Sequence, residues 1–409
     1  MMKNIKDSYQ HSYGLCLRLA LVGVLIGLIV GAVDTIFGRV LLLIGDVRSA
    51  HLPYLLPFLA LAGLVIVALY QRFGKDTQKG MGLIFEVAHG ESEVIPLRLI
   101  PLVVISTWLT HLFGGSAGRE GVAVQLGATI SHRFRHCLSF PNSSQVLLVT
   151  GMAAGFAGLF QTPLAGLFFA LEIVTLGQLN LYALLPSLFA VYTASSFSHF
   201  LGLEKFSHVL PLTQTITVEV FLKCLLLGLL FGLTGNAFVS LQSFFKKQAI
   251  DYLKNPYWRI ALIGGVLSLA LFFAHFGRYA GLGTNLIEAS FSTHQVYSYD
   301  FLMKLLFTTL TLAVGFQGGE VTPLFAIGAS LGVILAPVFG LPIELVAAAG
   351  YISVFASATN TLLAPILIGG EVFGFQNLPF FAITVIISYM LNRRQSIYGL
   401  QKAVAVDAE

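Results

Sequence analysis

The chain has 409 residues, of which 56% are hydrophobic and only 10% are charged. Soluble globular proteins usually carry about 25% charged residues, so this composition excludes an ordinary soluble domain and indicates an integral membrane protein. Long apolar runs recur and strand-like alternation is absent, so we expect spanning helices rather than a barrel. The small net charge of +4 comes without a basic stripe interleaved with aromatic residues, which argues against a nucleic-acid partner.

A polar N-terminal segment, 1–13, leads into a full-length apolar run rather than a short one with a cleavage site, so we expect no cleavable signal peptide. Two membrane halves are expected, 14–202 and 203–392, followed by a C-terminal segment, 393–409, with no soluble domain. The predicted helices are 14–33, 53–72, 97–113, 121–134, 144–158, 163–176, 179–201, 216–245, 257–276, 300–315, 323–338, 341–357, 361–373 and 378–392. Several are too short to cross about 30 Å of hydrocarbon, and short, interrupted apolar segments of this kind are typical of a transporter with a binding site near the middle of the membrane.

Basic clusters flank these apolar runs. Arg133 and Arg135 lie at the C-terminal end of one predicted helix, and Arg393 and Arg394 follow the last one. Such positions are typical of loops beside the membrane, where positive charge gathers on the cytoplasmic side. We expect a multi-pass protein of a prokaryotic-type plasma membrane.

The most informative motif lies between two of the predicted helices. It reads Gly-Ser-Ala-Gly-Arg-Glu-Gly-Val over residues 115–122, and it places Arg119 and Glu120 in a glycine-rich break. A carboxylate at membrane depth is costly and indicates a functional site. Glycines let the backbone turn, and the helix that follows points its positive end at the break. The motif therefore predicts an anion site with a titratable carboxylate beside it. The alternative, a capped and exposed helix end, fits poorly between long apolar runs.

An internal repeat with an offset of about 200 residues relates the two predicted halves. The pattern Gly115, Gly118, Glu120, Gly127, Ala128, Gly151, Phe156, Ala157, Thr162, Ala165 and Glu172 recurs as Gly315, Gly318, Glu320, Gly328, Ala329, Gly350, Phe355, Ala356, Thr361, Ala364 and Glu371. Glycine and alanine matches arise by composition alone, but matching glutamates are hard to dismiss because acidic residues are rare here. Two halves with matching broken helices are transporter architecture. For Glu172 and Glu371, a structural role that hydrogen-bonds a neighbouring loop is favoured over a role in transport.

Catalytic, metal and cofactor motifs give no competing prediction. Residues 328–332 match the G-x-S-x-G pattern around Ser330, but that nucleophile elbow needs a preceding strand, and this copy lies in an apolar helical run. No H-E-x-x-H, C-x-x-C or phosphate-cradling motif occurs. We expect neither an enzyme nor a bound cofactor, and an intramembrane serine hydrolase is kept only as an alternative from another class.

Gly118-Arg-Glu-Gly121, with a Gly-Gly-x-x-x-Pro element about 200 residues later, resembles the CLC family of anion channels and proton-coupled antiporters. The resemblance covers nearly the whole chain. It implies an all-α membrane protein with two inverted halves, a homodimer with a pore in each subunit, and Glu120 as the gating glutamate. The anion-site residues it implies, besides those already named, are Gly80, Met81, Gly82, Gly121, Val122, Gly319, Val321, Thr322 and Tyr398, the last in the pore-contacting C-terminal segment.

Departures from the family pattern resemble its fluoride–proton antiporter branch. Met81 stands where a chloride-binding serine is usual, and Val122 replaces a proline. Glu320, Val321 and Thr322 replace residues that are usually apolar or small. The internal proton glutamate of the chloride antiporters would fall at Ile173. These departures imply transport of fluoride and protons, with a chloride transporter or channel of the same family as the alternative.

The chemistry of these side chains agrees with this interpretation. A thioether offers an anion no good donor, so backbone N–H groups, the Tyr398 hydroxyl or a protonated carboxyl must meet a small hydrated anion. Ionised, Glu120 is itself an anion in the site; protonated, it is a donor that leaves the site to the substrate. Glu320 is either a second proton acceptor or a group that only polarises the site, and the sequence leaves both open.

Overall fold

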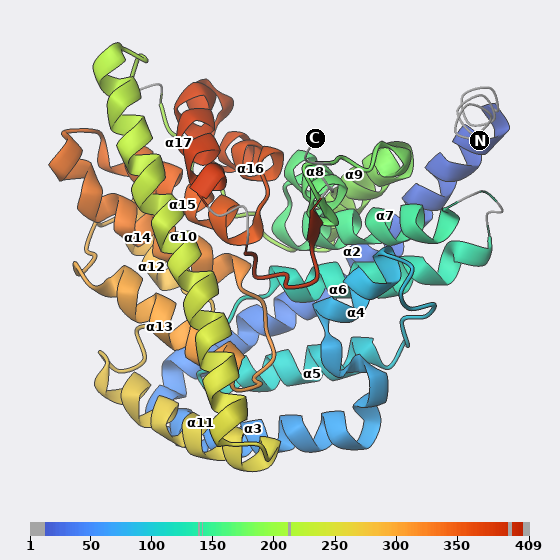
Figure 1. Cartoon of the computed structure of the whole chain (residues 1–409), viewed down its shortest axis with the longest axis horizontal. Helices are drawn as coiled ribbons and strands as arrows, with labels where there is room; N and C mark the ends of the chain where they lie inside the picture. Colours follow the sequence, from blue (N-terminus) through green and yellow to red (C-terminus); the bar gives the residue numbers. More distant parts are fainter. Residues whose placement is uncertain (1–12, 138–139, 141, 212–213, 392–394, 404–409) are drawn as a thin grey trace, which may run out of the picture.

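The computed structural model describes residues 13–137, 140, 142–211, 214–391 and 395–403. As predicted, the fold is helical (Figure 1). The helices are α2 (Tyr13–Leu55), α3 (Leu59–Leu69), α4 (Met81–Ala88), α5 (Leu99–Leu112), α6 (Glu120–Ser131), α7 (Ser143–Phe160), α8 (Pro163–Ile173), α9 (Leu184–Phe200), α10 (Val218–Tyr252), α11 (Pro256–Phe273), α12 (Thr284–Phe291), α13 (Asp300–Ala313), α14 (Val321–Phe339), α15 (Ile343–Thr359), α16 (Leu363–Phe373) and α17 (Leu378–Leu391). In this part of the chain the strands are the two-residue β1 (Thr175–Leu176) and β2 (Lys402–Ala403), which pair in parallel. Residues 1–12 of the polar N-terminal segment, Arg393 and Arg394 lie outside the described residues.

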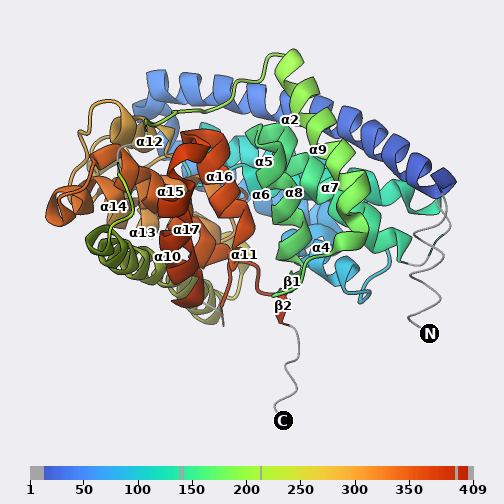
Figure 2. The ribbon, with the colours of Figure 1, turned by 90° about the horizontal axis from the view of Figure 1, so that it is seen from above.

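Six helical stretches among the described residues are long and apolar enough to cross a membrane, and several shorter apolar helices lie between them. Helix α2 runs along one face of the molecule, and the β1–β2 pair lies at the opposite face (Figure 2). Helices α6 and α14 begin at the buried residues Glu120 and Val321, so the backbone N–H groups at these ends need partners from other elements.

Helix α2 is much longer than the predicted 14–33. The prediction stopped early because the second half of the helix carries charges that lower the local hydropathy. The fold provides partners for two of these charges: Arg39 donates to the Leu201 carbonyl at 3.1 Å, and Arg48 donates to the His111 carbonyl at 3.3 Å. The helix is kinked at His51, two residues before Pro53. These contacts with distant segments stabilise the charged second half of the helix, and a local sequence pattern cannot reveal them.

The centre of the molecule is built from two tightly packed helix pairs, α6 with α7 and α14 with α15. Nearly every residue of these helices is buried, and glycines let the backbones touch. A Cβ on Gly127 would collide with the carbonyl of Gly151, and a Cβ on Gly328 would collide with that of Gly350. These four glycines are the ones matched by the sequence repeat, so corresponding residues make the same contact in each half.

Glu172 on α8 and Glu371 on α16 link the two halves, since each caps the N-terminus of the helix that carries the other. The Glu172 carboxylate accepts the backbone N–H groups of Leu362, Leu363 and Ala364 at the start of α16, at 2.9–3.0 Å. The Glu371 carboxylate accepts those of Leu164 and Ala165 at the start of α8, at 3.1 and 2.9 Å. A carboxylate at a helix N-terminus satisfies orphan donors and complements the helix dipole. The predicted structural contact with a neighbouring loop is therefore present for both residues.

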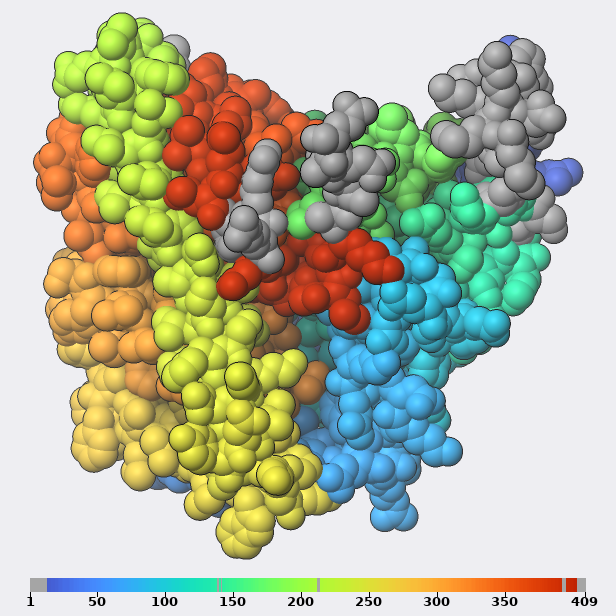
Figure 3. Space-filling view, in the orientation of Figure 1, coloured from blue at the N-terminus to red at the C-terminus, as the bar shows by residue number. Residues whose placement is uncertain are grey.

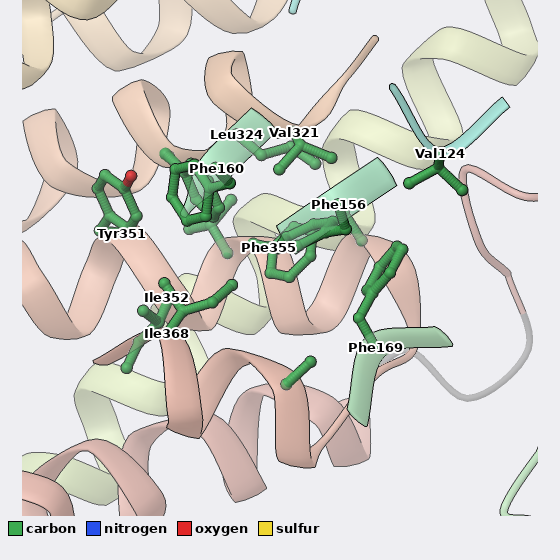
Figure 4. Close-up of a cluster of buried hydrophobic side chains, with 14 of the residues drawn as sticks. Val124, Phe156, Phe160, Phe169, Val321, Leu324, Tyr351, Ile352, Phe355 and Ile368 are labelled. Atoms are coloured by element: carbon green, nitrogen blue, oxygen red, sulfur yellow. The ribbon is translucent and has the colours of Figure 1, made fainter. Parts of the chain in front are cut away.

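An aromatic cluster fills the space between the two helix pairs (Figure 4). The Phe156 and Phe169 rings are 4.7 Å apart, and Phe169 stacks on Phe355 at 6.0 Å. Phe325 stacks on Tyr351 at 4.0 Å and also contacts Phe355 at 5.1 Å. Burial of this much apolar area stabilises the interface and fixes α8 between α7 and α15.

Two short helices were not predicted. Both α4 and α12 have eight residues, and each is directly preceded by a glycine with positive φ, 53° at Gly80 and 89° at Gly283. Such a glycine gives an abrupt entry into a helix that is too short for a clear hydrophobic period. The missed α4 matters most, because Met81 is its first residue.

Candidate functional site

The two glycine-rich loops of the repeat meet at the centre of the molecule. The N–H of Gly118 donates to the Gly319 carbonyl at 2.5 Å, and that of Gly319 donates to the Gly118 carbonyl at 2.8 Å. A Cβ on Gly118 would lie 2.8 Å from the Pro323 ring and 2.9 Å from the Gly319 carbonyl oxygen. Only glycine allows this approach, which brings the N-termini of α6 and α14 together.

Glu120 is the first residue of α6, and its carboxylate reaches the N-terminus of α14. Its Oε2 accepts the Thr322 hydroxyl at 2.5 Å, the Thr322 N–H at 3.2 Å and the Arg119 N–H at 3.3 Å. The side chain is only 1% exposed. An ionised Glu120 thus occupies an anion-binding position that a helix N-terminus provides.

Arg119 leaves this carboxylate only partly neutralised. Its Nε lies 3.6 Å from the Glu120 Oε1, beyond ordinary hydrogen-bond distance. Glu120 Oε1 and the Arg119 Nε and Nη1 are buried without a hydrogen-bond partner among the described residues. Unpaired buried polar atoms are costly and occur at sites where another group binds or moves.

A cavity of about 540 Å³ opens beside this pair of helix ends. Figure 3 shows the corresponding hollow between α10, residues 75–88 and the C-terminal segment 395–403. The predicted site residues that line it are Gly80, Met81, Gly82, Gly121, Glu320 and Tyr398. The other predicted site residues do not line it. Arg119 is 14% exposed, and the rest are buried: Gly118, Glu120, Val122, Gly319, Val321 and Thr322. The predicted site therefore has two adjoining parts. One is this cavity, called the inner cavity below, and the other is the α6–α14 junction, where Gly118 and Glu120 contact Gly319 and Thr322.

Met81 and Tyr398 line this cavity from two different segments, α4 and the C-terminal segment. Met81 begins α4 and is half-buried, so a thioether lies at the helix end where the resemblance expects a hydroxyl. Tyr398 lies in the irregular segment after α17 rather than on a helix. Its ring packs on Phe85 at 5.6 Å and Phe169 at 6.4 Å, and its hydroxyl is buried without a protein partner in the described chain. That hydroxyl is available to an anion or to water.

Glu320 is the N-cap residue of α14 and lies at the cavity wall. Its Oε1 accepts the side-chain amide of Gln242, on α10, at 3.2 Å. Sequence reasoning missed Gln242, and it also missed Gln125 and Lys246, which line the same cavity. The sequence offers only a weak indication of their role, since Gln242 belongs to a polar run that interrupts the apolar pattern of α10.

Two further predictions concern residues outside the cavity. Ser330 lies in the interior of α14, where its hydroxyl donates to the Ala326 carbonyl at 2.7 Å. The strand that a nucleophile elbow requires is therefore replaced by helix at this position. Ile173 is fully buried, and its carbonyl accepts the Gln401 amide at 2.9 Å, so a backbone contact with the C-terminal segment lies where the resemblance expects an acidic side chain.

Comparison with known proteins gives consistent matches. A family model described as voltage gated chloride channel matches residues 62–393. A Pseudomonas syringae pv. tomato protein described as a chloride/fluoride channel protein is 36% identical over 391 residues, which cover 94% of this chain and 86% of the relative. A Yersinia pseudotuberculosis protein described as an H⁺/Cl⁻ exchange transporter is 29% identical over 378 residues, which cover 85% and 78%.

The solved structures match over the whole fold. A structure described as a CLC-type fluoride/proton antiporter is 53% identical, covers 96% of this chain and 100% of its own, and superposes with a TM-score of 0.94. A slow cyanobacterial Cl⁻/H⁺ antiporter, 21% identical with a TM-score of 0.76, shares the fold. The family model and these relatives each span most of the sequence, and the chain is a multi-pass membrane protein that belongs to the CLC family.

Proposed function

We propose that this chain is an antiporter that exports fluoride across the cell membrane as protons enter. The observation that carries this proposal is the Glu120 carboxylate, which is held at the N-terminus of α14 by the Thr322 hydroxyl at 2.5 Å. A carboxylate and a small anion compete for the same backbone donors. Protonation removes the charge from Glu120 and lets fluoride take its place, so each proton delivered permits anion movement.

The proposed selectivity for fluoride depends on the inner cavity. Met81 supplies no donor there, while the Tyr398 hydroxyl and the ends of α4 and α6 remain available. The relative of known structure that is 53% identical is described as a fluoride/proton antiporter, which supports the same substrates for this chain. A homodimer in a prokaryotic plasma membrane is part of the proposal and rests on the family resemblance.

The experiment that tests the substrate is efflux from liposomes containing the purified chain, measured with fluoride-selective and chloride-selective electrodes. We expect rapid fluoride efflux and much slower chloride efflux. Equal rates would favour the chloride transporter or channel alternative, which the description of the Pseudomonas relative also admits.

Ser330→Ala should transport like the native chain, since Ser330 is proposed to act only in packing; loss of transport would reopen the hydrolase alternative.

A further inference from the structure

Helix α10 contributes polar side chains to the inner cavity through one short stretch. Gln242, Ser243 and Lys246 all line the cavity, and Gln242 and Lys246 are four residues apart, so they lie on the same helix face. Most of the remaining helix is apolar, as expected for a spanning segment. Polar side chains of a spanning helix that face a cavity are placed to act in that cavity.

Glu320 is located between this patch and the α6–α14 junction. Its Oε1 accepts the Gln242 amide at 3.2 Å. Its Oε2 points the other way, 3.8 Å from the position that a Cβ on Gly121 would occupy, and Gly121 directly follows Glu120. Glu320 borders the cavity, whereas Glu120 does not. A proton that travels from the cavity to Glu120 therefore meets the Glu320 carboxyl first.

We propose that Gln242, assisted by Lys246, is a positioning residue that holds Glu320 at the cavity wall and sets the pH at which Glu320 takes up the transported proton. This inference rests on the proposed function and adds α10 to its proton route. In the proposed step, a hydronium ion in the cavity gives a proton to the Glu320 carboxylate and is left as water. Glu320 then passes this proton to the ionised Glu120 carboxylate and is itself ionised again, so no proton is gained or lost.

The direction of the effect follows from the groups around Glu320. The Gln242 amide donates to the ionised carboxylate and stabilises it, and the exposed ammonium of Lys246 attracts it from the cavity side. Lys79 also lines the cavity, but Glu86 neutralises it at 2.6 Å. The buried Tyr398 side chain, from the C-terminal segment, interacts electrostatically with both Glu320 and Glu120. Removing Gln242 or Lys246 thus favours the protonated form of Glu320 and extends it to higher pH.

The test measures the pH dependence of coupled fluoride–proton exchange in liposomes, at equal pH on both sides. Gln242→Met keeps the side-chain length but removes the donor, and should move the midpoint of the profile to higher pH by about one unit. Lys246→Met should move it the same way by a smaller amount, because an exposed charge is screened. Matched controls on the same helix are Gln248→Met and Lys247→Met, which do not line the cavity and should leave the midpoint unchanged.

A second comparison separates positioning from general damage to the fold. In a Glu320→Gln background, Gln242→Met should cause no additional shift in the pH dependence of fluoride efflux, since the group through which it acts is gone. An equal shift in that background, or an unchanged midpoint in both single variants, would overturn the inference. If Gln242→Met does not fold, the exposed Lys246→Met variant serves as the test: a shift of its midpoint to higher pH supports the inference, and an unchanged midpoint overturns it. Failure of the native chain to exchange fluoride for protons would instead overturn the proposed function.

Discussion

At the scale of single residues, Glu120 is proposed to be both a competitor for the anion site and a proton carrier. Its contacts with Thr322 persist in part when the carboxylate becomes an amide, because the amide oxygen still accepts hydrogen bonds. An amide, however, does not exchange a proton at ordinary pH. Substitution by glutamine therefore separates packing from proton transport.

We predict that Glu120→Gln abolishes proton movement while the protein remains folded. The variant should show no fluoride accumulation driven by a pH gradient in liposomes, and its thermal unfolding midpoint should stay close to that of the native chain. Proton-driven fluoride uptake by Glu120→Gln vesicles would remove Glu120 from the proton route.

Met81→Ser should raise chloride flux relative to fluoride flux. The serine hydroxyl restores a donor at the N-terminus of α4, and its smaller side chain widens the cavity. We expect a partial change, because Val321 and Thr322 also differ from the chloride pattern of the family. The measurement is the fluoride-to-chloride ratio of efflux rates; a ratio equal to the native one would show that Met81 only packs.

At the scale of helices, the glycine contacts between α14 and α15 position the end that receives Glu120. Gly328→Ala would place a methyl group against the Gly350 carbonyl, with the Tyr351 nitrogen only 2.9 Å away. Overpacking of this kind costs about 1–3 kcal/mol. We therefore predict a lower unfolding midpoint for Gly328→Ala in detergent.

The matched control is Gly265→Ala on α11, where a Cβ meets nothing within 4 Å. Alanine is the better helix former, so this variant should be as stable as the native chain or slightly more so. Equal stability of Gly328→Ala and Gly265→Ala would contradict the close backbone contact between α14 and α15.

The C-terminal segment that contains Tyr398 is tied down by β2 and by an ion pair at its end. Lys402 Nζ lies 2.6 Å from Glu91 Oε1, and this ammonium holds the pKa of the exposed Glu91 carboxyl below its ordinary value. A lowered carboxyl pKa means that the contribution of the pair is complete at neutral pH and is lost as the pH falls through that lowered value.

Lys402→Gln should therefore increase hydrogen–deuterium exchange of residues 395–403 at pH 7, and acidification should reduce the difference from the native chain. The increase should be modest, since exposed ion pairs contribute little. Lys223→Gln breaks a comparable exposed pair with Glu219 on α10 and serves as the control. Equal exchange of the segment in native and Lys402→Gln protein would show that β2 alone fixes it.

At the scale of the whole molecule, sequence patterns predicted the helical class and most helix positions, since long apolar runs are local features. They also predicted that Glu120 and Glu320 begin matching helices, because glycines and acidic residues are conspicuous in an apolar chain. The division at residue 202 and the homodimer stay predictions.

Other parts of the site could not be predicted, because they depend on contacts between distant segments. The bond from Gln242 to Glu320 spans 78 residues, and the bond from Thr322 to Glu120 spans 202. The short α4 was missed because eight residues carry little periodicity. The reciprocal caps of Glu172 and Glu371 were predicted only as contacts with a nearby loop, without their partners.

Uphill transport tests the central proposal most directly. Liposomes containing the purified chain are loaded with equal fluoride inside and outside, and a proton gradient is then imposed while a fluoride electrode records the external concentration. An antiporter must move fluoride against the gradient that develops, toward the side from which protons come, and this movement should stop when a protonophore collapses the pH gradient. If fluoride stays at equilibrium until an electrical potential drives it, the chain is a passive channel and proton-coupled exchange is wrong.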